Sequence, residues 1–280
     1  DALRDARLPD GLGASLAQAC AAARVRPLLV RRPGRRDAED GMRVFTAFAH
    51  PARPWIETAT LSDPHELLDL DLTALGSGRS AGLTHYNGSL FCVCTHGRHD
   101  ACCAERGRPV ATALAAAYPD ETWEVSHIGG DRFAGNMLVL PHGLYYGRLD
   151  AQSSRDVAER HAAGSLDLNH VRGRSSYAMP VQFAELALRR QLTEARLDAL
   201  RLVSRHLADD VTHATFEVND TRWTVRVRTA VSSDLQQLTC RSTRDNPAQT
   251  HEVIEIVRTS PGALWSQATP AHRPPGAVAP

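Results

Sequence analysis

Sulfur and imidazole side chains are concentrated in one stretch of the sequence, Cys94-Thr95-His96-Gly97-Arg98-His99-Asp100-Ala101-Cys102-Cys103. Four of the six cysteines lie between positions 92 and 103. Thiolate sulfur binds iron–sulfur clusters, zinc and copper(I) well. Cys94 and Cys103 are nine positions apart, which is too far for a zinc knuckle or a C-x-x-C redox pair. The spacing favours a loop that leaves a strand, surrounds a metal group and enters a helix.

A second stretch carries the imidazole that complements this sulfur, and it reads Ser126-His127-Ile128-Gly129-Gly130-Asp131-Arg132-Phe133. Each stretch follows a short apolar run that predicts a strand, over residues 90–93 and 123–125. The two glycines allow a close backbone approach and a positive φ. We therefore expect His127 and the cysteines to meet at the ends of two neighbouring strands, in a soft-metal site.

The remaining sulfur and imidazole side chains are weaker candidates. Cys92 and Cys94 are two residues apart on a strand and point to the same face, and we expect Cys92 to be a core residue. Cys102 adjoins Cys103, and two neighbouring side chains rarely ligate one metal, so one of the two is expected to be structural. We also expect Cys240 to be structural. The loop residues His96 and His99 are expected to be solvated or to support a ligand.

The overall composition excludes several function classes. Basic and acidic residues balance, at 32 each, which removes the electrostatic argument for a nucleic-acid or anionic-membrane partner. No apolar run approaches the roughly 20 residues that span a bilayer, and the first residues lack a signal-peptide hydrophobic region. Six cysteines are too few for a disulfide-dense secreted scaffold. Their clustering indicates metal or redox chemistry in a reducing compartment, and we expect a cytoplasmic location.

Element order predicts the framework around the two stretches. Residues 81–205 suggest strand, helix, strand, hairpin and helix, which is typical of an α/β domain of thioredoxin-like type. The hairpin is expected over 137–148. A helical stretch is expected over 180–203, either as one helix or as two that meet near Thr193. Residues 1–80 form an N-terminal α/β extension, and 206–262 a β-rich C-terminal appendage with a turn at Asn219-Asp220. The proline-containing tail, 263–280, lacks core-forming residues and is expected to be disordered.

Three motifs together resemble the sucrase/ferredoxin-like family. They are the Cys94 to Cys103 stretch, the stretch His127-Ile128-Gly129-Gly130-Asp131-Arg132-Phe133-Ala134-Gly135-Asn136, and Leu144-Tyr145-Tyr146-Gly147-Arg148. The likeness runs from about Cys20 to Val203. It implies a thioredoxin-like [2Fe–2S] ferredoxin fold in which two cysteines of the first motif and two histidines of an H-x-G-G-H motif ligate the cluster. The "sucrase" part of the family name gains no support from these residues.

Carried over by position, the resemblance implies Cys94, Cys103 and His127 as cluster ligands. The second histidine of the family motif falls on Asp131, so the sequence departs from the pattern there. Four possibilities stay open at this stage. Asp131 is the fourth ligand, although carboxylate oxygen is harder than imidazole; Cys102 replaces it; Cys240 folds in as a distant ligand; or no cluster forms.

These observations give three hypotheses of different classes. The first is a soluble electron-transfer protein that carries one [2Fe–2S] cluster and serves a redox partner protein that the sequence does not identify. The second is a metal-free thiol-redox protein that uses Cys102 or Cys103 at a predicted helix start, where thiolates are stabilised. The third is a zinc-stabilised binding module. The sequence favours an electron carrier over a hydrolase, since it contains no nucleophile elbow, P-loop or dinucleotide-binding glycine motif.

Overall fold

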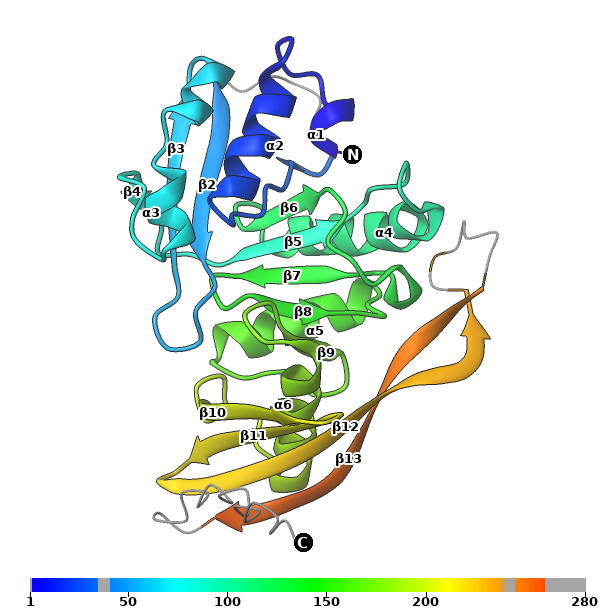
Figure 1. Ribbon diagram of the computed structural model, residues 1–280. Helices are drawn as coiled ribbons and strands as arrows, with labels where there is room; N and C mark the ends of the chain where they lie inside the picture. Colours follow the sequence, from blue (N-terminus) through cyan, green and yellow to red (C-terminus); the bar gives the residue numbers. More distant parts are fainter. Residues whose placement is uncertain (1, 35–40, 238, 240–244, 260–280) are drawn as a thin grey trace, which may run out of the picture.

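The computed structural model describes residues 2–34, 41–237, 239 and 245–259 (Figure 1). Within these residues the chain forms a mixed α/β structure with three β-sheets. Cys240 and the tail 263–280 lie outside the described residues. The predicted α/β class, with an N-terminal extension and a C-terminal β-rich region, is confirmed, whereas the thioredoxin-like description stays a prediction.

A six-stranded sheet lies at the centre, in the order β1-β6-β5-β7-β8-β9. Its strands are β1 (Val30–Arg31), β5 (Leu90–Cys94), β6 (Thr122–Val125), β7 (Met137–Leu140), β8 (Leu144–Tyr146) and β9 (Val171–Arg174). Strand β5 pairs in parallel with β6 and antiparallel with β7. The predicted hairpin is confirmed, since Met137 pairs with Tyr146 across β7 and β8.

Helices cover one face of the central sheet. They are α4 (Ala101–Ala117) and α5 (Ala151–Ala162), whereas α6 (Met179–Leu192) contacts β9 and packs mainly against the C-terminal sheet. Leu114 of α4 and Val157 of α5 pack with Phe91, Val93 and other sheet residues in one apolar cluster. Because side chains alternate along β5, Cys92 and Cys94 point to the opposite face. There they join a second cluster with Ile56 and Trp123, and Cys92 is a core residue as predicted.

The N-terminal extension supplies the cover for that opposite face. Its elements are α1 (Ala2–Asp5), α2 (Leu12–Ala22), β2 (Met42–Phe48), β3 (Trp55–Leu61), the 3₁₀ helix η1 (Pro64–Leu68), α3 (Leu72–Gly76) and β4 (Thr84–His85). Strands β2, β3 and β4 form their own antiparallel sheet. Phe45 of β2 contacts Trp123 of β6 edge to face, with ring centroids 5.1 Å apart, so this small sheet packs onto the central one.

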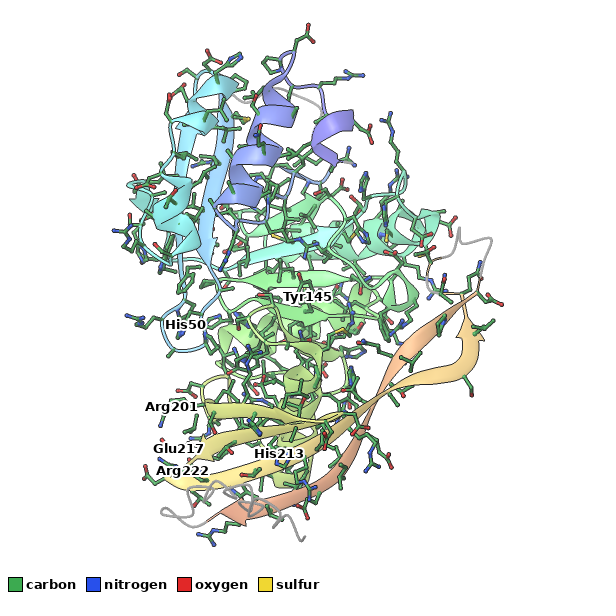
Figure 2. All side chains as sticks on the ribbon, in the orientation of Figure 1. His50, Tyr145, Arg201, His213, Glu217 and Arg222 are labelled. Atoms are coloured by element: carbon green, nitrogen blue, oxygen red, sulfur yellow. The ribbon has the colours of Figure 1, made fainter. Side chains whose placement is uncertain are left out.

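A four-stranded antiparallel sheet follows α6 and packs against it. Its strands are β10 (Arg201–Ala208), β11 (Val211–Val218), β12 (Thr221–Gln236) and β13 (Asn246–Thr259). The predicted turn at Asn219-Asp220 is confirmed, with both residues at positive φ. Figure 2 shows Arg201, Glu217 and Arg222 on these strands, and Glu217 pairs with both arginines.

The predicted helical stretch over 180–203 was wrong in its second half. Helix α6 ends at Leu192, and Thr193 follows it in the left-handed conformation, with φ of 52°. Residues from Arg201 onward belong to β10, because they pair with β11. The predicted domain boundaries stay predictions, and the one between 205 and 206 falls inside β10. Among the described residues, no helix is long and apolar enough to cross a membrane.

Candidate metal centre

Two loops meet at one edge of the central sheet, where the parallel strands β5 and β6 both end (Figure 1). The first loop, residues 95–100, joins Cys94 to the start of α4. The second, residues 126–130, leads from β6 into the 3₁₀ helix η2 (Asp131–Phe133). Because parallel strands present their carboxyl ends at the same edge, the two cysteine- and histidine-bearing motifs lie together.

The packing of α4 on β5 fixes the distance between the two candidate sulfur ligands. Gly107 of α4 lies against the end of β5 so closely that an added Cβ would be 2.1 Å from the carbonyl oxygen of Cys94. Only glycine permits this approach, which brings the first turn of α4 and Cys103 beside Cys94. Both cysteines are 1% exposed.

The glycine pair shapes the second loop. Gly129 and Gly130 have φ values of 93° and 81°, which favour glycine. The Arg172 guanidinium covers Gly130 and donates from Nη1 to Asn136 Oδ1, at 3.1 Å. Asn136 in turn donates from Nδ2 to the Gly130 carbonyl oxygen, at 2.8 Å. These contacts fix the backbone between His127 and Asp131.

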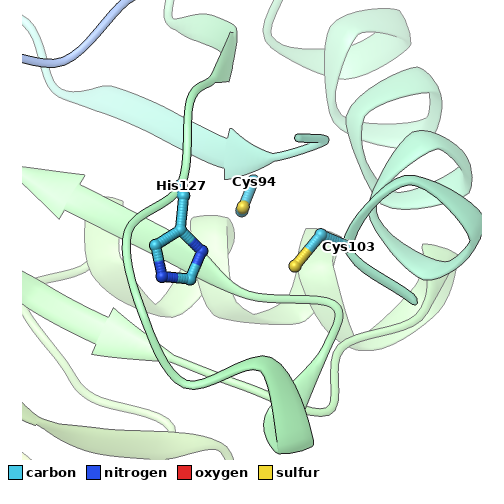
Figure 3. A group of neighbouring side chains, drawn as sticks. All are labelled: Cys94, Cys103 and His127. Atoms are coloured by element: carbon cyan, nitrogen blue, oxygen red, sulfur yellow. The ribbon is translucent and has the colours of Figure 1, made fainter. Parts of the chain in front are cut away.

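The structure brings together three residues that the sequence predicted as ligands. The donor atoms of Cys94, Cys103 and His127 all lie within 4.8 Å of one another. Figure 3 shows the two sulfur atoms and the imidazole ring turned toward one another from β5, α4 and the second loop. Thiolate and imidazole are the donors that iron, zinc and copper prefer.

Asp131, the predicted fourth ligand, lies beside this group. Its carboxylate oxygen Oδ1 is 3.2 Å from His127 Nδ1 and accepts a hydrogen bond of 3.4 Å from the Cys103 thiol. The donor atoms of Asp131, His127 and His99 form a second group within 4.8 Å. His99, which we expected to be solvated or to support a ligand, therefore lies within reach of a metal at this site.

Hydrogen bonds favour the thiolate form of Cys94. The single proton of the Cys103 thiol lies between Cys94 and Asp131 Oδ1 and stabilises the Cys94 thiolate, as do the backbone N–H groups of His96 and Ile128. These hydrogen bonds lower the pKa of Cys94 to about 7 despite burial. The hydrogen bond to Cys94, with burial, raises the pKa of Cys103. In the metal-free pair, Cys94 therefore loses its proton at a lower pH than Cys103. A bound cation would displace the proton of Cys103, as metal binding to thiols requires.

Burial keeps the imidazole of His127 in the neutral form that binds metals. It lowers the pKa of His127, and this effect exceeds the opposing attraction of Asp131. The ring nitrogen Nδ1 is buried and, although close to Asp131, makes no hydrogen bond with any described residue. A neutral imidazole next to two thiols suits a metal ligand.

Of the cysteines that the structure describes, Cys20, Cys92 and Cys102 are not in the donor group. Cys102 is half-buried, and its thiol donates to the backbone oxygen of Asp131 at 3.4 Å. Burial, together with the charges of Asp100 and Asp131, raises its pKa. Cys92 is core, with a pKa raised by burial to about 12, and Cys20 is buried with Leu3 and Leu16 in a separate cluster.

Sequence reasoning missed two residues that shape the site, Arg172 and the partner of its guanidinium, Asn136. The isolated arginine between Val171 and Gly173 carries no motif that marks it. Asn136 ends the second motif stretch, but nothing in its residue type predicted a hydrogen bond back to Gly130.

Comparison with protein families identified a matching family model. The family model described as sucrase/ferredoxin-like matches residues 15–173, which is more than half of the chain. No curated protein and no solved structure matches the chain.

Proposed function

The chain belongs to the sucrase/ferredoxin-like family, and on this premise we propose that it is an electron-transfer protein that holds one [2Fe–2S] cluster between its two loops. The observation that carries the proposal is the convergence of the Cys94, Cys103 and His127 donor atoms within 4.8 Å. The donor set fits the group, since iron–sulfur clusters are bound by cysteine thiolates, and in Rieske centres by two histidines on one iron.

The protein's own residues would perform three tasks. Cys94 and Cys103 supply sulfur donors, with Cys94 held near its thiolate form. His127 supplies a neutral imidazole nitrogen at the more exposed side of the site, since its side chain is 26% exposed. Ile128 and the apolar cluster around Cys92 exclude water from the inner side. When bound, the cluster would accept and release single electrons.

The redox partner is proposed to be a protein with an acidic surface. Two exposed arginines, Arg132 and Arg148, lie beside the site, with their guanidinium carbons 4.9 and 5.3 Å from the Phe133 ring centroid. Positive charge at the rim of a redox site attracts anionic partners and speeds their association.

Metal and sulfide analysis tests the proposal. The chain would be purified without oxygen, reconstituted with iron and sulfide, and assayed for iron, acid-labile sulfide, visible absorption and EPR after reduction. Two irons and two sulfides per chain are expected, as [2Fe–2S] stoichiometry requires. A colourless, EPR-silent protein would overturn the proposal. Zinc without sulfide would favour the zinc-stabilised module instead.

Variants locate the cluster in the chain. Cys94→Ser and Cys103→Ser are expected to lose iron and colour. Cys20→Ser serves as the matched control, because Cys20 is equally buried but lies in a different apolar cluster. Equal losses in all three would indicate a general folding defect rather than ligation.

The metal-free thiol-redox alternative gains less support from the site. A reactive cysteine combines a lowered pKa with exposure. Here the thiol of lowered pKa, Cys94, is 1% exposed, whereas the more accessible Cys102 has a raised pKa.

A further inference from the structure

The site needs a fourth donor, and the first loop offers an imidazole for it. We propose that His99 supplies the fourth ligand to the metal centre formed by Cys94, Cys103 and His127, and that Asp131 positions the two imidazoles. This inference rests on the proposed function, because it identifies a ligand of the same site.

The two histidine rings are neighbours although they come from different loops. The ring centroids of His99 and His127 lie 3.7 Å apart, with 33° between the ring planes. A donor atom of each also lies within 4.8 Å of the other and of Asp131. A metal bound by His127 on this side therefore has a second imidazole within reach.

Asp131 contacts the donors in the manner of a supporting carboxylate. Its Oδ1 lies 3.2 Å from His127 Nδ1 and accepts from the Cys103 thiol, while its Oδ2 lies 3.7 Å from His99 Nε2. A carboxylate that touches several ligands orients their rings and strengthens their basicity. Imidazole also suits iron in a sulfur-containing site better than the harder carboxylate oxygen.

Burial divides the four donors into an inner and an outer pair. Cys94 and Cys103 are each 1% exposed, whereas the side chains of His127 and His99 are 26% and 45% exposed. A two-iron cluster with both sulfur ligands inside and both imidazoles toward solvent fits this division. The Asp131 side chain, at 5% exposure, belongs to the inner group by burial.

His96 provides a matched comparison from the same loop. Its Nδ1 accepts a hydrogen bond of 3.3 Å from the backbone N–H of His127, and its ring centroid is 6.1 Å from that of His99. His96 belongs to neither group of donor atoms. The same substitution at positions 96 and 99 therefore separates ligation from loop packing.

The test counts nitrogen ligands by pulsed EPR of the reduced, reconstituted full chain and of three variants. Two coordinated nitrogens are expected in the wild type, in His96→Gln and in Asp131→Asn when iron is in excess. His99→Gln is expected to retain one nitrogen, or to bind at least tenfold less iron. The double variant His99→Gln/Asp131→His should recover the second nitrogen, since it places an imidazole opposite His127.

The opposite pattern would overturn the inference. A single nitrogen in the wild type that is unchanged in His99→Gln would exclude His99 as a ligand. If no iron–sulfur cluster assembles in any form, the proposed function fails, and the same variants would be loaded with zinc. X-ray absorption at the zinc edge would then count imidazoles: two in the wild type and one in His99→Gln would retain the role of His99, whereas equal counts would remove it.

Discussion

The Nδ1 atom of His127 lies 3.2 Å from Oδ1 of Asp131, a carboxylate that is almost fully buried. The two residues are four positions apart, and the glycine pair between them turns the backbone so that both side chains face the same site. A buried carboxylate is costly unless it is paired or lies near a metal. Its place beside the imidazole is the basis of the proposed role of Asp131 in positioning the ring.

Removing the charge of Asp131 should weaken metal binding without changing the fold. Asp131→Asn keeps the shape of the side chain but loses its negative charge. We expect iron affinity to fall about 10- to 100-fold, as for other carboxylates that support histidine ligands. Competition with an iron chelator measures the change, and an unaltered far-UV circular dichroism spectrum controls for folding. Wild-type affinity in this variant would contradict the supporting role.

The two glycines of the second loop should respond differently to the same substitution. At Gly129 an added Cβ meets no atom within 4 Å, so Gly129→Ala should cost only the strain of a positive φ, about 1 kcal/mol. At Gly130 the Cβ would lie 2.3 Å from Nη2 of Arg172. Gly130→Ala should also displace that guanidinium from Asn136, for a total of about 3 kcal/mol. Urea unfolding of both variants measures the difference, and equal costs would show that Arg172 moves aside freely.

Alkylation should distinguish the cysteines at the site. Because the pKa of Cys102 is raised by burial and by two nearby carboxylates, its reaction with iodoacetamide should be slow at pH 7 and should accelerate at alkaline pH. Cys94 and Cys103, which are each 1% exposed, should be labelled more slowly than Cys102 in the native protein, and metal loading should slow their labelling further. Mass spectrometry of tryptic peptides reports each site. Rapid labelling of Cys102 at pH 7 would revive the thiol-redox hypothesis.

Charge reversal at the rim should alter electron transfer according to the charge of the oxidant. In Arg132→Glu/Arg148→Glu, stopped-flow oxidation of the reduced protein by hexacyanoferrate(III) should slow several-fold at low salt, roughly within the range of electrostatic steering. Oxidation by a cationic hexaammine complex should become faster. Both effects should diminish as salt screens the charges. Arg53→Glu/Arg79→Glu, at two exposed positions of the N-terminal extension, changes the net charge equally and is the control. An equal effect in this control would assign the change to net charge rather than to the arginines beside the site.

Acid stability should depend on a buried histidine outside the metal centre. Burial, reinforced by His142 and Arg174, lowers the pKa of His161 to about 4. Since an unfolded histidine titrates near 6.5, the unfolded chain takes up the proton first as the pH falls. The contribution of His161 to the free energy of unfolding should therefore be fully present above pH 6.5. It should fall by about 3 kcal/mol as the pH drops toward 4.

Urea unfolding at several pH values measures that decline. His161→Gln should remove about 3 kcal/mol of the pH dependence between 6.5 and 4, because glutamine does not titrate. An identical decline in the variant would assign the effect to other groups, beginning with His142, whose pKa burial also lowers.

The sequence by itself determined which side chains could bind a metal and where the strands that carry them end. Cys94 and Cys103 have the spacing of a strand–loop–helix unit, and His127 follows the next strand. Parallel pairing places the ends of both strands at one edge of the sheet, whatever path the loops take. Local sequence patterns were therefore enough to predict this part of the site. The core position of Cys92 followed equally from the two-residue period of a strand.

Tertiary structure decided the contacts that have no local pattern. Helical propensity over 201–203 was overridden by pairing of β10 with β11, since a weak local preference yields to a sheet's hydrogen bonds and burial. The contact of His99 with His127 depends on the paths of two irregular loops, and that of Arg172 with Gly130 joins residues 42 positions apart. Such contacts arise from packing after the elements assemble, and no periodicity or spacing in the chain encodes them.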